Sequence, residues 1–375
     1  MATDFSAEGL LDGLDGDARD ARERLLQELE VDGVGLDELR EASAEGRLAL
    51  VPLERVLAPP GRRFTFAEMV EQAELEPDFL AHLTRALGLP MPDADEPIFT
   101  EADVEAARTV RGFRAAGISD DALLEVTRVL GQSLSQVVAA LRSMFTQSFF
   151  SPEDTEYDVA VRWAQVAEQL NPMLEQVVRY LLRAQQVAQL RQGVFDLAGL
   201  GTGSTQIAVA FADLAGFTRL GEQVAADQLG SVAGRLTALA VDAARPPVRL
   251  VKMIGDAAML VSPDPRALLD AVLDLLEAVE GEGEEFPPLR AGIAAGDALS
   301  RGGDWFGAPV NLASRITDKA RPGSVVVSAE VKDRVAAEAY SWTKLPGRRK
   351  FKGISEDQVL YRVRRAATTA EGAAA

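Results

Sequence analysis

The sequence predicts two architectures in one chain, a mainly α-helical N-terminal half and a mixed α/β (α+β) C-terminal half. In residues 205–365, apolar runs of strand length alternate with longer segments whose apolar residues recur at helical spacing. Residues 1–204 show chiefly the helical spacing, as between Leu25 and Leu39. The charge changes at the same place, because 36 acidic and 18 basic residues lie before position 205, whereas 22 acidic and 21 basic residues follow.

The composition is that of an ordinary globular protein large enough for two or three domains. Of the 375 residues, 47% are hydrophobic and 26% are charged. The chain has no cysteine, which excludes disulfides and thiolate metal sites. It also has no apolar run of about 18 residues and no signal-peptide pattern at its start, so we expect a cytoplasmic protein without a membrane span.

Breaks in the pattern divide the chain into four expected segments. Residues 1–156 form an acidic helical domain, residues 157–204 a helical connector with a glycine-rich linker, residues 205–365 the α/β domain, and residues 366–375 a disordered tail. We expect the connector helix to be interrupted at Asn171-Pro172, because proline removes a helix hydrogen bond. The apolar stripe from Val177 to Leu190 fits either core packing or contact with a second subunit.

The acidic N-terminal half is unsuited to nucleic acid, because binding phosphates requires a basic surface. Residues 85–119 loosely resemble the MerR-type winged-helix pattern, but they lack the basic residues of a DNA-binding surface, so we expect a helical packing module. The only histidine, His82, lies beside Leu80 and Leu83 on a predicted helix. We expect it to be packed or partly exposed, in preference to a role in proton sensing.

Two aspartates are expected to come together at the ends of neighbouring strands. The apolar run 206–211 predicts a buried strand with Asp213 at its carboxyl end. The strand-like run 248–251 leads to Gly255-Asp256, which predicts a tight hairpin turn into a return strand. Each strand end then presents one carboxylate to the same place.

Two carboxylates at close range repel each other unless a cation lies between them. Mg²⁺ suits such a place, because it binds one or two protein carboxylates and completes its shell with water and phosphate oxygens. Gly216 allows a sharp turn after Asp213, and the backbone N–H groups leading into a helix at Thr218 then face a phosphate. The pattern predicts a two-metal nucleotide site, with two unrelated surface turns as the alternative.

The sequence Phe-Ala-Asp-Leu-Ala-Gly-Phe-Thr at 211–218, together with Lys-x-x-Gly-Asp at 252–256, resembles the class III nucleotidyl cyclase catalytic domain. The resemblance covers about residues 205–365 and implies a ferredoxin-like core. It makes the helical N-terminal half a regulatory domain, similar to that of mycobacterial adenylate cyclases of the pH-sensing type. It implies a signalling lyase that converts ATP to 3′,5′-cyclic AMP and releases pyrophosphate.

Further residues follow in the order that the cyclase resemblance requires. It implies that two Mg²⁺ or Mn²⁺ ions per site bind three groups, the carboxylates of Asp213 and Asp256 and the carbonyl of Leu214. Asn311 and Arg315 lie four residues apart, on one face of a helix predicted to begin near position 308. The resemblance implies that Asn311 orients the ribose and that Arg315 stabilises the α-phosphoryl group in the transition state.

The remaining assignments concern the substrate. The resemblance implies that Arg290 and Lys352 bind the triphosphate, with Lys350 as the alternative to Lys352. It also places Phe217 and Thr218 at the nucleotide. No nucleophilic side chain is needed, because the 3′-hydroxyl of the nucleotide attacks its own α-phosphorus.

The choice of base follows from hydrogen bonding. Adenine offers an acceptor at N1 and a donor at N6. Lys252 only donates and Asp304 only accepts, so the two side chains complement adenine. Guanine presents the reverse pattern, which would leave buried donors facing each other.

The resemblance implies a homodimer, because sites in this family form between two catalytic domains and one chain carries both sets of residues. The resemblance implies that Asp213, Asp256 and Arg290 come from one subunit. The other subunit then gives Lys252, Asp304, Asn311, Arg315 and Lys352. The alternatives are a guanylate cyclase, a nucleotide-binding regulator without turnover, and a transcriptional regulator. We expect the N-terminal half to respond to a signal such as a small molecule, a lipid or pH, with its many carboxylates rather than His82 carrying an acid response.

Overall fold

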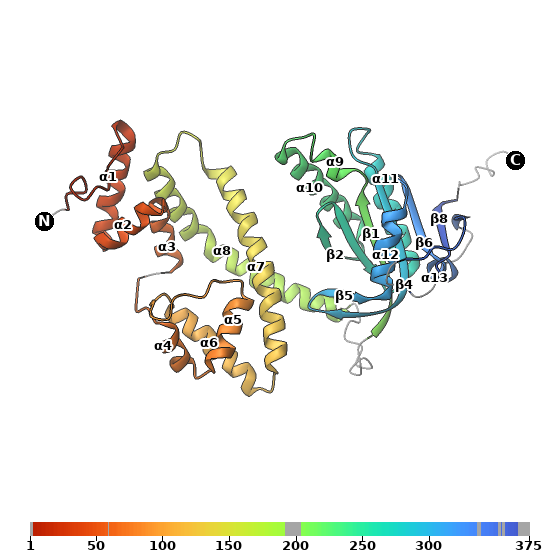
Figure 1. Cartoon of the computed structure of the whole chain (residues 1–375), viewed down its shortest axis with the longest axis horizontal. Coiled ribbons are helices and arrows are strands. Elements are labelled where there is room, and N and C mark those ends of the chain that lie inside the picture. The colour runs from red at the N-terminus through yellow and green to blue at the C-terminus, as the bar shows by residue number, and fades with distance from the viewer. Residues whose placement is uncertain are drawn as a thin grey trace. The chain divides into compact units, whose positions relative to one another are not determined.

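The computed structural model describes residues 3–58, 60–191, 204–335, 339–351, 354 and 357–366. Its contacts divide the chain into two compact units, residues 1–188 and 189–375 (Figure 1). The glycine-rich linker, Lys352 and nearly all of the expected tail lie outside the described residues. Within the described part, we find no helix with both the length and the apolarity that crossing a bilayer requires.

The N-terminal unit is helical, as the sequence predicts. Its helices are α1 (Gly16–Val31), α2 (Leu36–Ala44), the 3₁₀ helix η1 (Leu48–Leu50), α3 (Val51–Leu57), α4 (Phe66–Ala73), α5 (Pro77–Ala86), α6 (Glu101–Ala115), α7 (Asp120–Phe149) and α8 (Glu156–Arg191). Capping boxes fix the starts of α4 and α6, where Thr65 and Thr100 each exchange hydrogen bonds with the acidic residue three positions later.

Two separate hydrophobic clusters hold this unit together. The first joins the segment from Phe5 to Val51 and is completed by Ala160 of α8. The second joins α4, α5, α6 and the start of α7, where a single strand-like bridge pairs Phe64 with Phe99. Residues 85–119, which were expected to form a helical packing module, contribute Phe99, Val104 and Ala107 to the second cluster. This segment therefore packs in a helical core, as expected. His82 is exposed on α5.

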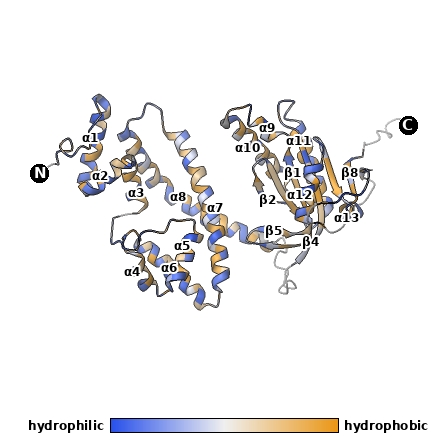
Figure 2. Ribbon diagram, in the orientation of Figure 1, coloured by the Kyte–Doolittle hydropathy of each residue, from blue (hydrophilic) through white to orange (hydrophobic). Residues whose placement is uncertain are grey.

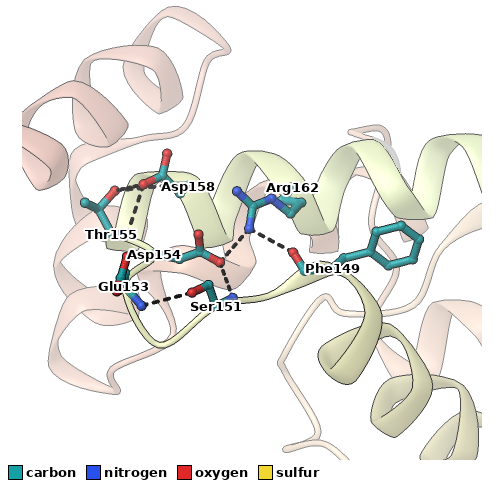
Figure 3. Close-up of polar contacts among 7 residues, drawn as sticks. All are labelled: Phe149, Ser151, Glu153, Asp154, Thr155, Asp158 and Arg162. Carbon is teal, nitrogen blue, oxygen red and sulfur yellow. Dashed lines mark hydrogen bonds and ion pairs between the residues drawn. The ribbon is translucent and has the colours of Figure 1, made fainter.

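The turn between α7 and α8 is held by polar contacts around Arg162 (Figure 3). The guanidinium of Arg162 donates to the carbonyl of Phe149, the last residue of α7, at 2.8 Å and also to the carboxylate of Asp154. The same carboxylate accepts the backbone N–H of Ser151 at 2.7 Å. Arg162 thereby satisfies a helix-end carbonyl that has no partner within α7 itself.

The expected break at Asn171-Pro172 is wrong, because α8 runs without interruption through Pro172. Proline removes one hydrogen bond, to the carbonyl of Glu168, and does not forbid the helix. Pro172 and Glu168 are both exposed, so water can bond that carbonyl. The remaining bonds of a 36-residue helix keep the segment helical.

The C-terminal unit is one mixed sheet with helices on both faces. Its strands are β1 (Ser204–Leu214), β2 (Arg249–Ile254), β3 (Ala257–Ser262), β4 (Leu289–Arg301), β5 (Asp304–Gly307), β6 (Ser324–Ser328), β7 (Tyr340–Lys344) and β8 (Leu360–Arg365). Its helices are α9 (Phe217–Leu220), α10 (Ala226–Ala243), α11 (Pro265–Glu280), α12 (Ala308–Lys319) and α13 (Ala329–Arg334).

The strand order confirms the ferredoxin-like core. Among the described residues the order is β2-β3-β1-β4-β6-β8-β7, and β5 pairs with β4. Strands β1 to β4 thus form an antiparallel sheet in the order β4-β1-β3-β2, with helices following β1 and β3, which is the βαββαβ arrangement. Strand β6 is parallel to β4 and extends the sheet.

Alternation along β1 gives the sheet two different faces. Ala208, Ala210, Ala212 and Leu214 belong to a core shared with α10, α11 and α13. The residues between them, Ile207, Val209 and partly Phe211, pack in a second core with α12. Asp213 lies an even number of residues after Ile207, Val209 and Phe211, so its side chain projects from the same face of the sheet, the one covered by α12. The strands of the sheet are mostly hydrophobic, whereas α7 and α8 mix hydrophobic and hydrophilic residues along their lengths (Figure 2).

Candidate active site

The two predicted carboxylates come together where β1 ends and β2 turns into β3. Gly255 takes a left-handed conformation, with φ of 61°, and Asp256 follows it in the turn. The backbone N–H of Leu214 donates to the carbonyl of Asp256 at 3.2 Å, which ties the turn to β1. The pKa of Asp256 is raised, first by burial and then by the neighbouring charge of Asp213.

Arg290 forms an ion pair with Asp213. The β1–β4 register pairs Arg290 directly with Asp213. Its Nε and Nη2 atoms donate to Oδ2 of Asp213 at 2.9 and 2.6 Å. Its Nη1 atom donates to the carbonyl of Asp318, in the last turn of α12, at 3.4 Å. The guanidinium therefore places a positive charge directly against one of the two paired carboxylates.

A second group of predicted residues borders a cavity of about 430 Å³ on the same chain. Lys252 Nζ forms an ion pair with Asp304, whose other oxygen accepts the backbone N–H of Trp305 at 2.8 Å. Asn311 lines the same cavity. Apolar side chains form most of the remaining lining, namely Phe211, Ile254, Met259, Trp305, Phe306 and Val310. A flat, apolar ligand with a few polar edge groups fits such a surface.

The apolar lining was not predicted from the sequence, although signals for parts of it exist. Phe211 opens the first cyclase motif, and Trp305 and Phe306 directly follow Asp304. Strand β5, which carries both aromatic residues, has four residues and is stabilised by pairing with β4. So short a run gives no periodic pattern.

Helix α12 presents Asn311 and Arg315 on its exposed face. Leu312 and Ile316 are buried on the opposite face, which fixes the rotation of the helix against the sheet. Arg315 makes an ion pair of 3.7 Å with Asp318 on the same helix. Of these two predicted residues, Asn311 borders the cavity, and Arg315 lies about one turn further along α12.

The other predicted residues lie close to the carboxylates in sequence. Phe217 and Thr218 open the short helix α9 after Gly216, which has φ of 87°. The side chain of Leu214 is buried in the core. Lys350 is exposed, and Lys352 lies outside the described residues.

The paired carboxylates fit a divalent cation on the chemistry of the donor set. Within the described part of the chain, no cluster of three or more acidic or histidine side chains forms a complete protein cage for a metal. Mg²⁺ and the similar Mn²⁺ bind through one or two carboxylates and leave other positions to water and phosphate oxygens. Asp213 and Asp256 provide that open arrangement.

Two family models match the chain. The model described as an adenylate cyclase regulatory domain matches residues 3–192, and the model described as an adenylate and guanylate cyclase catalytic domain matches residues 202–364. Among solved structures, the adenylyl cyclase CyaB from P. aeruginosa is similar, with 21% identity and a TM-score of 0.39, over 45% of this chain and 98% of that one.

Two curated relatives extend the likeness over much or all of the chain. The pH-sensitive adenylate cyclase of Mycobacterium tuberculosis is 39% identical over 385 residues, covering 100% of this chain and 96% of that protein. An adenylate cyclase of Streptomyces griseus is 30% identical over 279 residues, covering 74% of this chain and 69% of that protein. The chain therefore belongs to the adenylate cyclase family, with a regulatory domain joined to a class III catalytic domain.

Proposed function

We propose that this adenylate cyclase forms 3′,5′-cyclic AMP at two equivalent sites, each shared between two copies of the chain. The proposal is supported by the division of the site residues into two groups. Neither Asp213 nor Asp256 lines the cavity that Lys252, Asp304 and Asn311 border. One chain thus carries two half-sites. We call Lys252, Asp304 and Asn311 with the cavity lining the base half, and Asp213 and Asp256 with Arg290 the metal half. A twofold dimer brings the base half of each chain against the metal half of the other.

The base half selects ATP. The Lys252–Asp304 pair offers a donor and an acceptor at one edge of the cavity, where adenine N1 accepts and adenine N6 donates. The aromatic and aliphatic lining packs against the faces of the base. GTP is disfavoured because guanine N1–H would face the ammonium of Lys252, leaving a buried donor without a partner.

The metal half holds the triphosphate. Catalytic domains of this class generally use divalent metals. We assign two Mg²⁺ or Mn²⁺ ions per site to Asp213 and Asp256, with the carbonyl of Leu214, where bound metal supplies Lewis acidity toward the 3′-hydroxyl and the phosphates. Arg290 contributes positive charge to the triphosphate. Lys352, or its alternative Lys350, adds a second positive charge from the other subunit. Phe217 and Thr218 follow Asp213 and lie on the same side of the nucleotide.

Asn311 and Arg315 act on the reacting centre. The 3′-hydroxyl forms a bond to the α-phosphorus, and the bond to pyrophosphate breaks. Negative charge grows on the α-phosphoryl oxygens during this exchange, and a fixed guanidinium from Arg315 stabilises it most in the transition state. Asn311 orients the ribose so that the hydroxyl lies in line with the leaving group.

Product analysis tests the proposed reaction, and mixing two inactive variants tests whether each site is shared between two subunits. Purified protein should form cyclic AMP from ATP with Mg²⁺ or Mn²⁺, and little cyclic GMP from GTP. Asp213→Ala and Arg315→Ala should each be inactive. Mixed as equal partners, they should recover up to about a quarter of the wild-type activity, because half of the dimers are mixed and each has one undamaged site. No recovery from a demonstrated heterodimer would count against shared sites.

The N-terminal unit regulates this dimer in our proposal. The apolar residues of α8 between Val177 and Leu190 are largely exposed on the single chain, which favours contact with a second subunit over packing within one core. Sites at a subunit interface respond to small changes in subunit approach. A small molecule, a lipid or pH is the proposed signal, and the M. tuberculosis relative is itself named as pH-sensitive.

A further inference from the structure

Helix α12 lies unusually close to the sheet at one point. A Cβ atom on Gly292 of β4 would lie 2.4 Å from the backbone nitrogen of Thr317 and 2.6 Å from the carbonyl oxygen of Ala313. Real Cβ atoms do not approach backbone atoms so closely, so only glycine allows α12 to rest directly on the backbone of β4. The same close approach brings the last turn of α12 to β1.

Thr317 joins α12 to β1 at this point. Thr317 is buried, with 4% of the residue's surface exposed. Its hydroxyl lies 2.9 Å from the carbonyl of Ala313, one turn earlier in α12, and 3.1 Å from the carbonyl of Phe211 in β1. The first contact is common for threonine in helices. The second is tertiary, and it reaches the strand residue two positions before Asp213.

The contact connects the two halves of the proposed site within one chain. Phe211 lines the base cavity with its side chain and accepts from Thr317 with its carbonyl. Thr317 lies two residues after Arg315 on α12, while the next residue, Asp318, accepts from Arg290. The position of α12 along β1 therefore sets where Arg315 lies.

We propose that Thr317 is a positioning residue for the cyclase reaction, which holds the last turn of α12 against β1 through the Phe211 carbonyl and thereby places Arg315. The inference rests on the function proposed above. A hydroxyl acting in this way should influence the transition state more than the ground state, because Arg315 acts mainly on the charge that develops during bond exchange. Loss of the hydroxyl should lower kcat without weakening nucleotide binding.

The experiment compares three variants of the full-length protein. Thr317→Val keeps the shape and removes the hydroxyl, and Thr317→Ser keeps the hydroxyl. Thr237→Val is the matched control, because the hydroxyl of Thr237 in α10 donates to the carbonyl of Ala233 at 2.9 Å and, among the described residues, makes no hydrogen bond to another element. The measurements are kcat with ATP, affinity for 3′-deoxy-ATP, which has no attacking hydroxyl, and hydrogen exchange in the last turn of α12.

The expected result is a kcat roughly 10- to 100-fold lower in Thr317→Val, with affinity for 3′-deoxy-ATP little changed. Thr317→Ser should recover most of the rate, and Thr237→Val should match the wild type. Exchange at the last turn of α12 should be faster in Thr317→Val alone.

Three results would overturn the inference. The first is a wild-type kcat with wild-type hydrogen exchange in Thr317→Val. The second is a loss of kcat in Thr317→Ser as large as that in Thr317→Val. The third is a fall in the affinity of Thr317→Val for 3′-deoxy-ATP as large as its fall in kcat. Wild-type formation of cyclic AMP tests the proposed function separately. The hydrogen-exchange measurement tests whether Thr317 holds α12 against β1, and it does so whether or not the protein turns over ATP.

Discussion

Replacing Arg290 by glutamine should expose the repulsion that this arginine relieves. The Arg290 and Asp213 side chains are 27% and 18% exposed, so the pair lies between a surface ion pair and a buried one. Surface pairs contribute about 0–1 kcal/mol, and breaking a buried pair costs about 3–5 kcal/mol. We therefore expect Arg290→Gln to lower the free energy of unfolding by about 2 kcal/mol without metal.

A loss of about 2 kcal/mol corresponds to a fall in Tm of roughly 4–8 °C for a unit of this size. Thermal unfolding in EDTA measures it. Arg235→Gln is the control, because Arg235 also makes two hydrogen bonds to one carboxylate, that of Glu282, but is 51% exposed. Its loss should change the free energy of unfolding by less than about 1 kcal/mol.

Metal should then distinguish the two variants. In the wild type a bound cation competes with Arg290 for Asp213, whereas in Arg290→Gln it does not. The same 2 kcal/mol makes Mn²⁺ binding without nucleotide up to roughly 30-fold tighter in the variant, which titration calorimetry detects. The reasoning is refuted if Arg290→Gln is no less stable than Arg235→Gln, or if both variants bind Mn²⁺ with wild-type affinity.

Three further predictions concern specificity, stability and regulation. Exchanging the pair in the double variant Lys252→Glu, Asp304→Lys reverses donor and acceptor, so the ratio of cyclic AMP to cyclic GMP formed should fall by roughly 100-fold; an unchanged ratio contradicts the assigned base contacts. Burial, with a hydrogen bond to Asp270, raises the pKa of Tyr340 from its ordinary value of 10.0 to about 12. The contribution of the protonated Tyr340 hydroxyl to stability is therefore complete below pH 10 and is lost as the pH rises toward 12. Urea unfolding should show that the free energy of unfolding falls less steeply with pH over this range in Tyr340→Phe than in the wild type. A shortened chain starting near Thr202 should remain a cyclase with altered activity and pH dependence; superimposable pH curves at equal dimer fraction would speak against regulation by the N-terminal half.

The strands and helices around the carboxylates were predictable because they depend on local sequence. The apolar run of β1, the Gly255-Asp256 turn and the spacing of Asn311 and Arg315 each specify a structure over a few residues. The ferredoxin-like strand order followed from the family resemblance and is confirmed by the sheet.

What the sequence did not predict depends on contacts between distant residues. The pairing of Arg290 with Asp213 arises from the register of β1 on β4, which joins residues 77 positions apart. The close packing of α12 on Gly292 of β4 likewise depends on residues that are distant in the sequence. The expected break at Pro172 failed for another reason, because a local propensity was outweighed by the helix around it. The roles of the site residues and the segment boundaries stay predictions.

The register of β1 also determines which changes in length the catalytic domain tolerates. Phe211 faces Met259 on one neighbouring strand and Gly292 on the other, and Met259 in turn faces Lys252. Side chains alternate between the two faces of a strand, so inserting or deleting one residue between positions 206 and 213 turns Asp213 away from α12 or moves Phe211 out of the cavity. Natural variation in this stretch should therefore consist of substitutions, with gaps confined to the loops. A domain-fusion junction placed inside β1 would destroy both halves of the site together, whereas one placed before residue 204 would leave them intact.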